Sequence, residues 1–167
     1  EDILLKGARS FAFEKVAALL QAQAHQTELE INLQALHHNL QVYKSRLAAG
    51  TKIMVMVKAF GYGSGDAEVA RTLQYNGVDY LAVAYADEAV LLRQAGVSLP
   101  IMVLNATEPS FDLLEQYNIE PEVFSFEMLE SLLQWCKEKG WQHFPIHLKI
   151  DTGMHRLGFG LPEVDTL

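Results

Sequence analysis

The chain has 167 residues, of which 50% are hydrophobic and 20% are charged, a composition typical of a folded globular domain. Its formal net charge is -8 and no block is rich in Lys and Arg, which argues against nucleic acid or an anionic membrane as a partner. No apolar run has the roughly 18–20 residues of a membrane span, no signal peptide is visible, and the single Cys136 suits a reducing compartment, so we expect a cytoplasmic protein.

The first 25 residues differ in pattern from the rest of the chain. They predict a short strand, a turn at Gly7 and an amphipathic helix that begins near Ser10. We therefore interpret residues 1–25 as a separate element, the end of something upstream, and residues 26–167 as the main unit.

The main unit begins with a predicted strand and helix. The stretch TELEIN (residues 27–32) alternates polar and apolar residues, and apolar residues then recur at helical spacing from Leu33 to Leu47. Asn32 is a suitable N-cap for this helix, and Gly50 is a suitable stop.

A regular alternation of strands and helices follows. The predicted strands are KIMVMVK (52–58), VDYLAVA (78–84), PIMVLN (100–105), EPEVFS (120–125) and PIHLKID (145–151). The predicted helices are Asp66–Tyr75, Asp87–Ala95, Ser110–Tyr117 and Phe126–Lys139, with glycines 77, 96 and 140 near their ends and LPEVDTL opening a further one. Apolar strands separated by helices indicate an α/β fold with parallel strands. Five strands fit either a small doubly wound sheet or the first part of a TIM-type (β/α) barrel, and the pattern leaves both open.

Lys58 is the first candidate site residue. It is predicted to end a strand, and parallel α/β folds bind ligands at the carboxyl ends of their strands. Partial burial favours the neutral form of a lysine amine, which a Schiff base to an aldehyde requires. Tyr62 can donate to a phosphate, and room for a phosphate comes from the glycines at 61, 63 and 65. This pattern suits a phosphorylated aldehyde cofactor, but a lysine reaching solvent beside an ordinary glycine turn would look the same.

The second candidate lies in HLKIDTGMHRLGF (residues 147–159). Strand alternation places His147, Lys149 and Asp151 on one face, and Arg156 follows in the loop at the carboxyl end of that strand. The alternative interpretation is an internal Lys149–Asp151 pair with a surface arginine. The histidines show no metal-ligand spacing, so we assign no metal.

These two motifs resemble those of the fold-type III, pyridoxal-phosphate-dependent alanine racemases. The family carries V-K-A, two variable residues and Y-G-x-G, here residues 57–65, and h-L-K-x-D-T-G-M-x-R-x-G, here residues 147–158. Many members of the family have D-A-Y-G-H-G where this chain has Phe60-Gly61-Tyr62-Gly63-Ser64-Gly65, so hydrogen bonds from that Asp and His are not expected here.

The resemblance implies a partial TIM-type barrel that binds pyridoxal 5'-phosphate and acts on alanine. Lys58 would carry the cofactor as a Schiff base and move a proton at the substrate Cα, and Tyr62 would hold the phosphate. Arg156 would lie near the cofactor's phenolic oxygen and bind the substrate carboxylate. Lys149 corresponds to a lysine that is carbamylated in many members, and carbamylation would turn a buried cation into an anion that orients Arg156.

The resemblance also implies that important parts lie outside these residues. The family's second base is a tyrosine of a C-terminal β domain, contributed across a homodimer interface, so we expect the 167-residue fragment alone to lack racemase activity. A pyridoxal-phosphate-binding homeostasis protein with a similar barrel and no racemase activity is the alternative, and a plain nucleotide-binding α/β domain is a third interpretation.

The leading segment has a resemblance of its own. ILLKGARSFAFEKVAALL (residues 3–20) is similar to the C-terminal end of the Mur ligase that adds D-alanyl-D-alanine to the UDP-muramoyl tripeptide. Because some bacteria fuse this ligase to alanine racemase, the resemblance implies a bifunctional ligase/racemase that serves peptidoglycan synthesis.

Overall fold

The computed structural model describes residues 30–62 and 66–167. The chain divides into two units, Glu1–Glu30 and Ile31–Leu167. The strand, turn and helix expected in residues 1–25 lie outside the described residues, so the assignment of that segment stays a prediction. Within the described part, no helix is long and apolar enough to cross a membrane.

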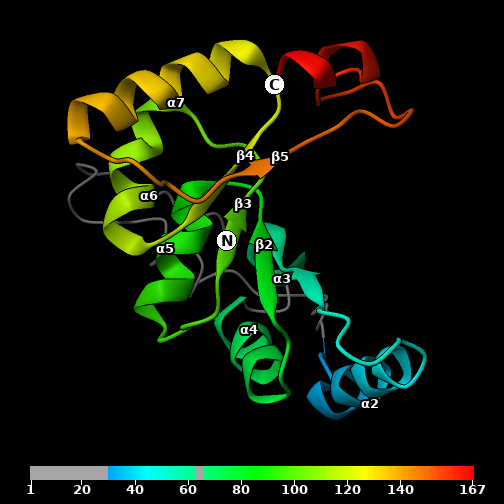
Figure 1. The fold of residues 1–167 in the computed structure, drawn as a ribbon. Helices are drawn as coiled ribbons and strands as arrows, with labels where there is room; N and C mark the ends of the chain where they lie inside the picture. Colours follow the sequence, from blue (N-terminus) through cyan, green and yellow to red (C-terminus); the bar gives the residue numbers. More distant parts are fainter. Residues whose placement is uncertain (1–29, 63–65) are drawn as a thin grey trace, which may run out of the picture. The chain divides into compact units, whose positions relative to one another are not determined.

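Strands and helices alternate through the second unit (Figure 1). The strands are β1 (Met54–Met56), β2 (Tyr80–Val83), β3 (Ile101–Val103), β4 (Glu120–Val123) and β5 (His147–Leu148). The α-helices are α2 (Leu33–Lys44), α3 (Lys58–Tyr62), α4 (Asp66–Tyr75), α5 (Ala86–Gln94), α6 (Phe111–Tyr117) and α7 (Phe126–Lys139). Two 3-10 helices, η2 (Glu108–Ser110) and η3 (Leu161–Thr166), complete the described elements.

The start of the unit corrects two expectations. Residues 30–32 are not in a strand, so the predicted strand is wrong for its described part. Asn32 caps α2 as expected, because its side chain accepts a hydrogen bond from the Ala35 amide at 3.0 Å. The helix ends at Lys44, well before Gly50, because the backbone amide of Ser45 donates hydrogen bonds to carbonyls of the last turn.

The sheet settles the choice between the two α/β architectures. All four strand pairs are parallel, and the spatial order β1-β2-β3-β4-β5 is the chain order. A doubly wound sheet reverses its strand order and carries helices on both faces, whereas a barrel keeps chain order and places its helices outside. Figure 1 shows α4, α5, α6 and α7 on one side of the strands. The fold is therefore a partial TIM-type barrel.

The hydrophobic core lies between the sheet and these helices. Leu81 and Val83 of β2 are 0% exposed, and so are Ile101 and Val103 of β3. They meet apolar residues of the helices, among them Ala70, Leu73, Ala89, Leu92, Phe111 and Leu114. Each fully buried aliphatic side chain of this kind contributes about 1.5–3 kcal/mol to folding. This core fixes the positions of the strand ends at which the candidate site lies.

The amino ends of the strands are held by Arg93. Its guanidinium donates four hydrogen bonds of 2.6–2.9 Å to main-chain carbonyls, those of Val97, Leu99, Tyr117 and Asn118. Burial lowers the pKa of Arg93, and the charge of Glu120 opposes that shift. Arg93 thereby ties the end of α5 to the segments that lead into β3 and β4.

A second polar cluster lies on the inner face of the same end. The Glu120 carboxylate accepts a hydrogen bond of 2.6 Å from the Tyr80 hydroxyl and lies 2.7 Å from Nε2 of His147. The Tyr80 and His147 rings meet edge to face at 5.6 Å. Burial and the hydrogen bond to Glu120 raise the pKa of Tyr80 to about 12. The first residues of β2, β4 and β5 are thus linked through their side chains.

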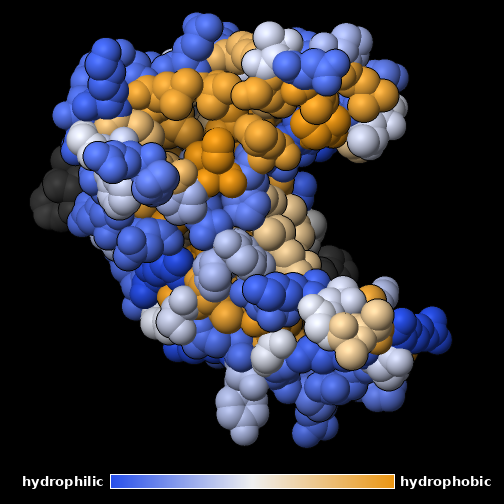
Figure 2. All heavy atoms as spheres, in the orientation of Figure 1, coloured by the Kyte–Doolittle hydropathy of each residue, from blue (hydrophilic) through white to orange (hydrophobic). Residues whose placement is uncertain are grey.

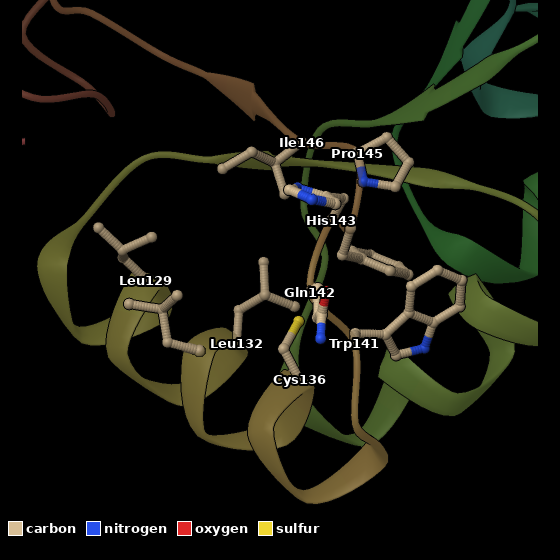
Figure 3. A pocket seen from close by; sticks show the side chains of 10 residues that line it. Leu129, Leu132, Cys136, Trp141, Gln142, His143, Pro145 and Ile146 are labelled. Carbon is tan, nitrogen blue, oxygen red and sulfur yellow. The ribbon is translucent and has the colours of Figure 1, made fainter.

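A cavity of about 490 Å³ lies between α7 and the segment that leads into β5 (Figure 3). Leucines of α7 form one wall, and the segment from Trp141 to Ile146 forms the other. Apolar side chains gather over this part of the molecule in Figure 2, and Leu133 and Leu148 are 59% and 48% exposed. The cavity contains none of the predicted site residues.

Candidate active site

Lys58 lies at the carboxyl end of β1, although it does not end the strand as expected. β1 stops at Met56, and Lys58 is the first residue of α3. The strand ladder continues one residue further through the Val57 amide, which donates to the Ala82 carbonyl at 2.8 Å. The Lys58 side chain is partly buried and has no hydrogen bond or ion pair with any other residue that the structure describes. Its amine is therefore available to a ligand.

The backbone after Lys58 is strained. Ala59 has φ 54, in the left-handed region, which costs an L-residue roughly 1–2 kcal/mol. Gly61 has φ 63 and is buried, and there glycine adopts the conformation without that penalty. Tight left-handed turns of non-glycine residues persist only where the surroundings hold them, and they concentrate at functional sites.

Glu88 holds this turn, and the sequence analysis missed it. One carboxylate oxygen accepts a hydrogen bond of 2.6 Å from the Ala59 amide. The other accepts from the amides of Ala84 and Tyr85 at 2.7 and 3.1 Å. Glu88 is the third residue of α5, a position from which a glutamate often reaches back to the helix start. A glutamate at this position of a helix predicts the bonds from the Ala84 and Tyr85 amides, but not the bond from the Ala59 amide.

The motif after β5 forms a closed loop. The amide of Asp151 donates to the Phe159 carbonyl, and the Phe159 amide donates to the Lys149 carbonyl, both at 2.8 Å. Gly158 packs so tightly against this closure that a Cβ there would lie 2.8 Å from the Asp151 nitrogen, and its φ is 121. Only glycine fits, which explains the glycine at the end of the motif. The loop from Asp151 to Gly158 therefore projects from the carboxyl end of β5.

Asp151 organises the first half of that loop. Its carboxylate accepts hydrogen bonds from the amides of Gly153 and His155 at 3.0 Å each, and it lies 3.1 Å from Nδ1 of His155. The amide of Gly153, followed by that of His155, lowers the pKa of Asp151. His155 adopts φ 54 in this turn. Asp151 therefore fixes the turn that begins this loop.

The alternative interpretation, an internal pair of Lys149 and Asp151, is wrong. Nζ of Lys149 instead lies 3.1 and 3.0 Å from the two oxygens of Glu122 on β4. Parallel register explains this, because Glu122 is paired with His147 and so its side chain shares a face with that of Lys149. Glu122 and Glu88 are the two buried charged residues of the described part, both 8% exposed.

Arg156 lies on the loop after β5. Like Lys58, it therefore follows the carboxyl end of a strand of the parallel sheet. It is exposed and has no hydrogen bond or ion pair within the described ranges. Tyr62 is the last residue of α3, and its side chain lies outside what the structure describes. The glycines at 63 and 65 also lie outside it. The structure thus places two side chains without partners in the described part, Lys58 and Arg156, just beyond the carboxyl ends of β1 and β5.

The profile of the family "Alanine racemase, N-terminal domain" matches residues 31–167. The match covers the barrel strands, the lysine turn and the loop after β5. This chain belongs to the alanine racemase family.

Relatives within the family support the same assignment. The alanine racemase of Thermodesulfovibrio yellowstonii is 41% identical over 134 residues, which are 78% of this chain and 36% of that protein. The alanine racemase of Geobacillus kaustophilus is 43% identical over 133 residues, 79% of this chain and 34% of that protein. The chain therefore spans about a third of the length of these alanine racemases.

Solved alanine racemase structures share the fold. The alanine racemase of Clostridium difficile 630 superposes with a TM-score of 0.72 at 40% identity, covering 77% of this chain and 34% of that one. The alanine racemase of Corynebacterium glutamicum gives a TM-score of 0.71 at 31% identity, covering 81% and 39%. The partial barrel of this chain is the common part.

Proposed function

We propose that these residues form the first part of the barrel of a pyridoxal-phosphate-dependent racemase that interconverts L- and D-alanine. The observation that carries the proposal is the unpaired, partly buried amine of Lys58 at the carboxyl end of β1, in a strained turn. Membership of the alanine racemase family supports the substrate class. A role in peptidoglycan synthesis, fusion to a Mur ligase, a homodimer and a cytoplasmic location are further parts of this proposal that follow from the resemblance.

The residues present fit pyridoxal phosphate. The cofactor carries an aldehyde and anionic groups, and the site offers a primary amine for the first and the unpaired guanidinium of Arg156 for the second. The Tyr62 hydroxyl, four residues beyond Lys58, is the proposed hydrogen-bond donor to the cofactor phosphate. When bound, the cofactor supplies an electron-withdrawing ring that stabilises negative charge at the substrate Cα.

The chain's own residues then have separate tasks. Lys58 holds the cofactor covalently and, once its amine is free, moves a proton at one face of the substrate Cα. Arg156 binds the substrate carboxylate with its planar fork and so orients that carbon. Racemisation also needs a base on the opposite face, and the resemblance assigns it to a tyrosine beyond residue 167. The 167 residues alone are therefore expected to lack racemase activity.

Lys149 has an anionic partner without any modification. Both oxygens of the Glu122 carboxylate lie within 3.1 Å of its Nζ, so carbamylation is not required to neutralise this cation. The carbamylation implied by the resemblance stays a prediction. Peptide mass spectrometry of protein kept in bicarbonate checks it, because a carbamylated Lys149 carries the added mass of one carbon dioxide.

Borohydride trapping tests the proposal. Full-length protein is incubated with pyridoxal phosphate, reduced with borohydride, digested and mapped by mass spectrometry. We expect the pyridoxyl adduct on Lys58, and its loss in Lys58→Ala. The control is Lys52→Arg, since Lys52 is exposed and precedes β1. An adduct that maps to Lys52 or Lys149 in the unmodified protein would sink the assignment.

A further inference from the structure

We propose that Glu88 is the positioning residue of Lys58: a buried carboxylate on α5 that fixes the backbone from which the lysine projects. The inference rests on the proposed function of Lys58 and adds a residue to that site. Glu88 touches neither cofactor nor substrate in this account. It acts through the Ala59 amide, 2.6 Å from its carboxylate.

The two peptide planes that flank the Lys58 Cα are both anchored. The plane before it contains the Val57 carbonyl, which accepts a hydrogen bond of 3.2 Å from the Gly61 amide. The plane after it contains the Ala59 amide, which donates to Glu88. Because these planes define φ and ψ of Lys58, the two bonds together set the direction of its Cα–Cβ bond. Removing Glu88 releases one of them.

The conformation of Ala59 shows why an anchor is needed. An alanine at φ 54 prefers to leave the left-handed region, and leaving it would rotate the plane that follows Lys58. The bond from its amide to an ionised carboxylate is of the strong, charge-assisted kind. Glu88 therefore holds a backbone conformation that the local sequence does not favour.

A helix cap is the simpler role for Glu88, and it accounts for only one side of the carboxylate. One oxygen binds the amides of Ala84 and Tyr85 at the start of α5, as a capping glutamate does. The other oxygen is directed at Ala59, a residue 29 positions earlier in the chain. Glu88 consequently joins the carboxyl end of β2 to the turn after β1.

Glu88→Gln is the first test, made in the full-length protein with pyridoxal phosphate as the probe. Glutamine keeps the size of the side chain but presents an amide nitrogen to one of the two sets of donors. The concentration of pyridoxal phosphate that half-saturates borohydride trapping at Lys58 should rise about tenfold. Asp87→Asn is the matched control, because Asp87 is the exposed neighbour on the same helix, and it should leave this concentration unchanged.

Two further variants separate positioning from stability. Glu120→Gln weakens the cluster of Glu120, Tyr80 and His147 at the other end of the strands, so it should lower the unfolding midpoint without changing trapping at Lys58. Ala59→Gly removes the cost of the left-handed conformation. Added to Glu88→Gln, it should recover at least half of the lost affinity on a logarithmic scale. If Glu88 only caps α5, Ala59→Gly should not recover the lost affinity.

Amide hydrogen exchange gives a readout that needs no cofactor. In cofactor-free protein, exchange at the Ala59 amide should accelerate in Glu88→Gln more than exchange at the amides of α5. If Glu88→Gln does not fold, Glu88→Asp replaces it, since a side chain one methylene shorter can cap its own helix but cannot also reach Ala59.

The outcomes separate this inference from the proposed function. Failure of the unmodified protein to form any adduct on Lys58 overturns the proposed function, and exchange at Ala59 then still tests Glu88. Unchanged trapping and unchanged exchange in Glu88→Gln overturn the positioning role. The positioning role is also overturned if Ala59→Gly fails to recover the trapping lost in Glu88→Gln and Glu120→Gln causes the same loss.

Discussion

The arginines at the two ends of the parallel sheet differ in their hydrogen bonding. At the amino end, the guanidinium of Arg93 donates hydrogen bonds to four main-chain carbonyls. At the carboxyl end, Arg156 is exposed and binds none of the described residues. The same side chain is a structural clamp in one place and an available cation in the other.

The backbone shows the same contrast. Near the amino end, the left-handed residue other than glycine in the described part is Asn118, which tolerates that conformation well and closes α6. Those at the carboxyl end are Ala59, which tolerates it poorly, and His155, and their amides are held by Glu88 and Asp151. The left-handed Ala59 and the two unpaired cations of the proposed site therefore lie at the carboxyl ends of the strands, the end at which parallel α/β folds bind ligands.

The largest expected effect is at Lys58. Lys58→Arg preserves the positive charge and most of the length, but a guanidinium does not form the Schiff base. Racemase activity of the full-length protein should fall to background, and the borohydride adduct should disappear, while the unfolding midpoint stays unchanged. Chiral chromatography of alanine after incubation with L-alanine measures the activity. Substantial D-alanine formation by this variant would contradict the role of Lys58.

Arg156→Ala should come next. Loss of charge-assisted hydrogen bonds to a carboxylate, each of about 1.5–3 kcal/mol, should lower kcat/KM for alanine by about 10- to 100-fold. Stability should change by no more than about 0.5 kcal/mol, because the side chain is exposed and unpaired among the described residues. Arg156→Lys should remain impaired, since a point charge does not reproduce the planar fork. Equal losses of activity and stability would make Arg156 a structural residue.

Arg93→Met tests the other end. The substitution keeps much of the apolar stem but leaves four carbonyls without their donor, so the free energy of unfolding should fall by about 2–4 kcal/mol. Urea denaturation measures it. The affinity for pyridoxal phosphate, measured by trapping at a temperature where the variant is folded, should stay within about twofold. A selective loss of affinity would break the division between the two ends.

The smallest effect concerns Tyr80 at high pH. Its pKa is raised from 10.0 to about 12 in the folded protein. A raised folded pKa means that the stabilisation is fully present below pH 10 and is lost as the pH rises toward about 12. Tyr80→Phe should remove that part of the pH dependence, as followed by unfolding midpoints between pH 9 and about 12. An unchanged profile in Tyr80→Phe would assign the loss to other groups.

The sequence predicted the helices better than the strands. The bounds of α4 and α7 agree with the prediction, because local signals mark their ends, such as the Ser125 cap and the left-handed Gly140 of α7. The strands are shorter than their apolar runs. Hydrophobic runs report burial, whereas a strand ends where the ladder of main-chain bonds ends, as at Met56.

The site was predictable only in its exposed chemistry. Lys58 and Arg156 stand out in the sequence because they follow apolar strands and lie in specific motifs, and their roles stay predictions. Glu88 and Glu122 did not stand out, because their contacts to Ala59 and Lys149 join residues 29 and 27 positions apart. Such contacts depend on strand register, which a single sequence without a fold does not specify.

The most direct test of the contrast between the two ends is hydrogen exchange of the full-length protein with and without pyridoxal phosphate, followed by mass spectrometry. The account predicts that cofactor slows exchange in peptides covering residues 57–62 and 151–158, at the carboxyl ends of β1 and β5. Peptides covering residues 93–99 and 117–120, at the amino end, should show no change. Protection confined to the amino-end peptides would contradict the placement of the ligand site.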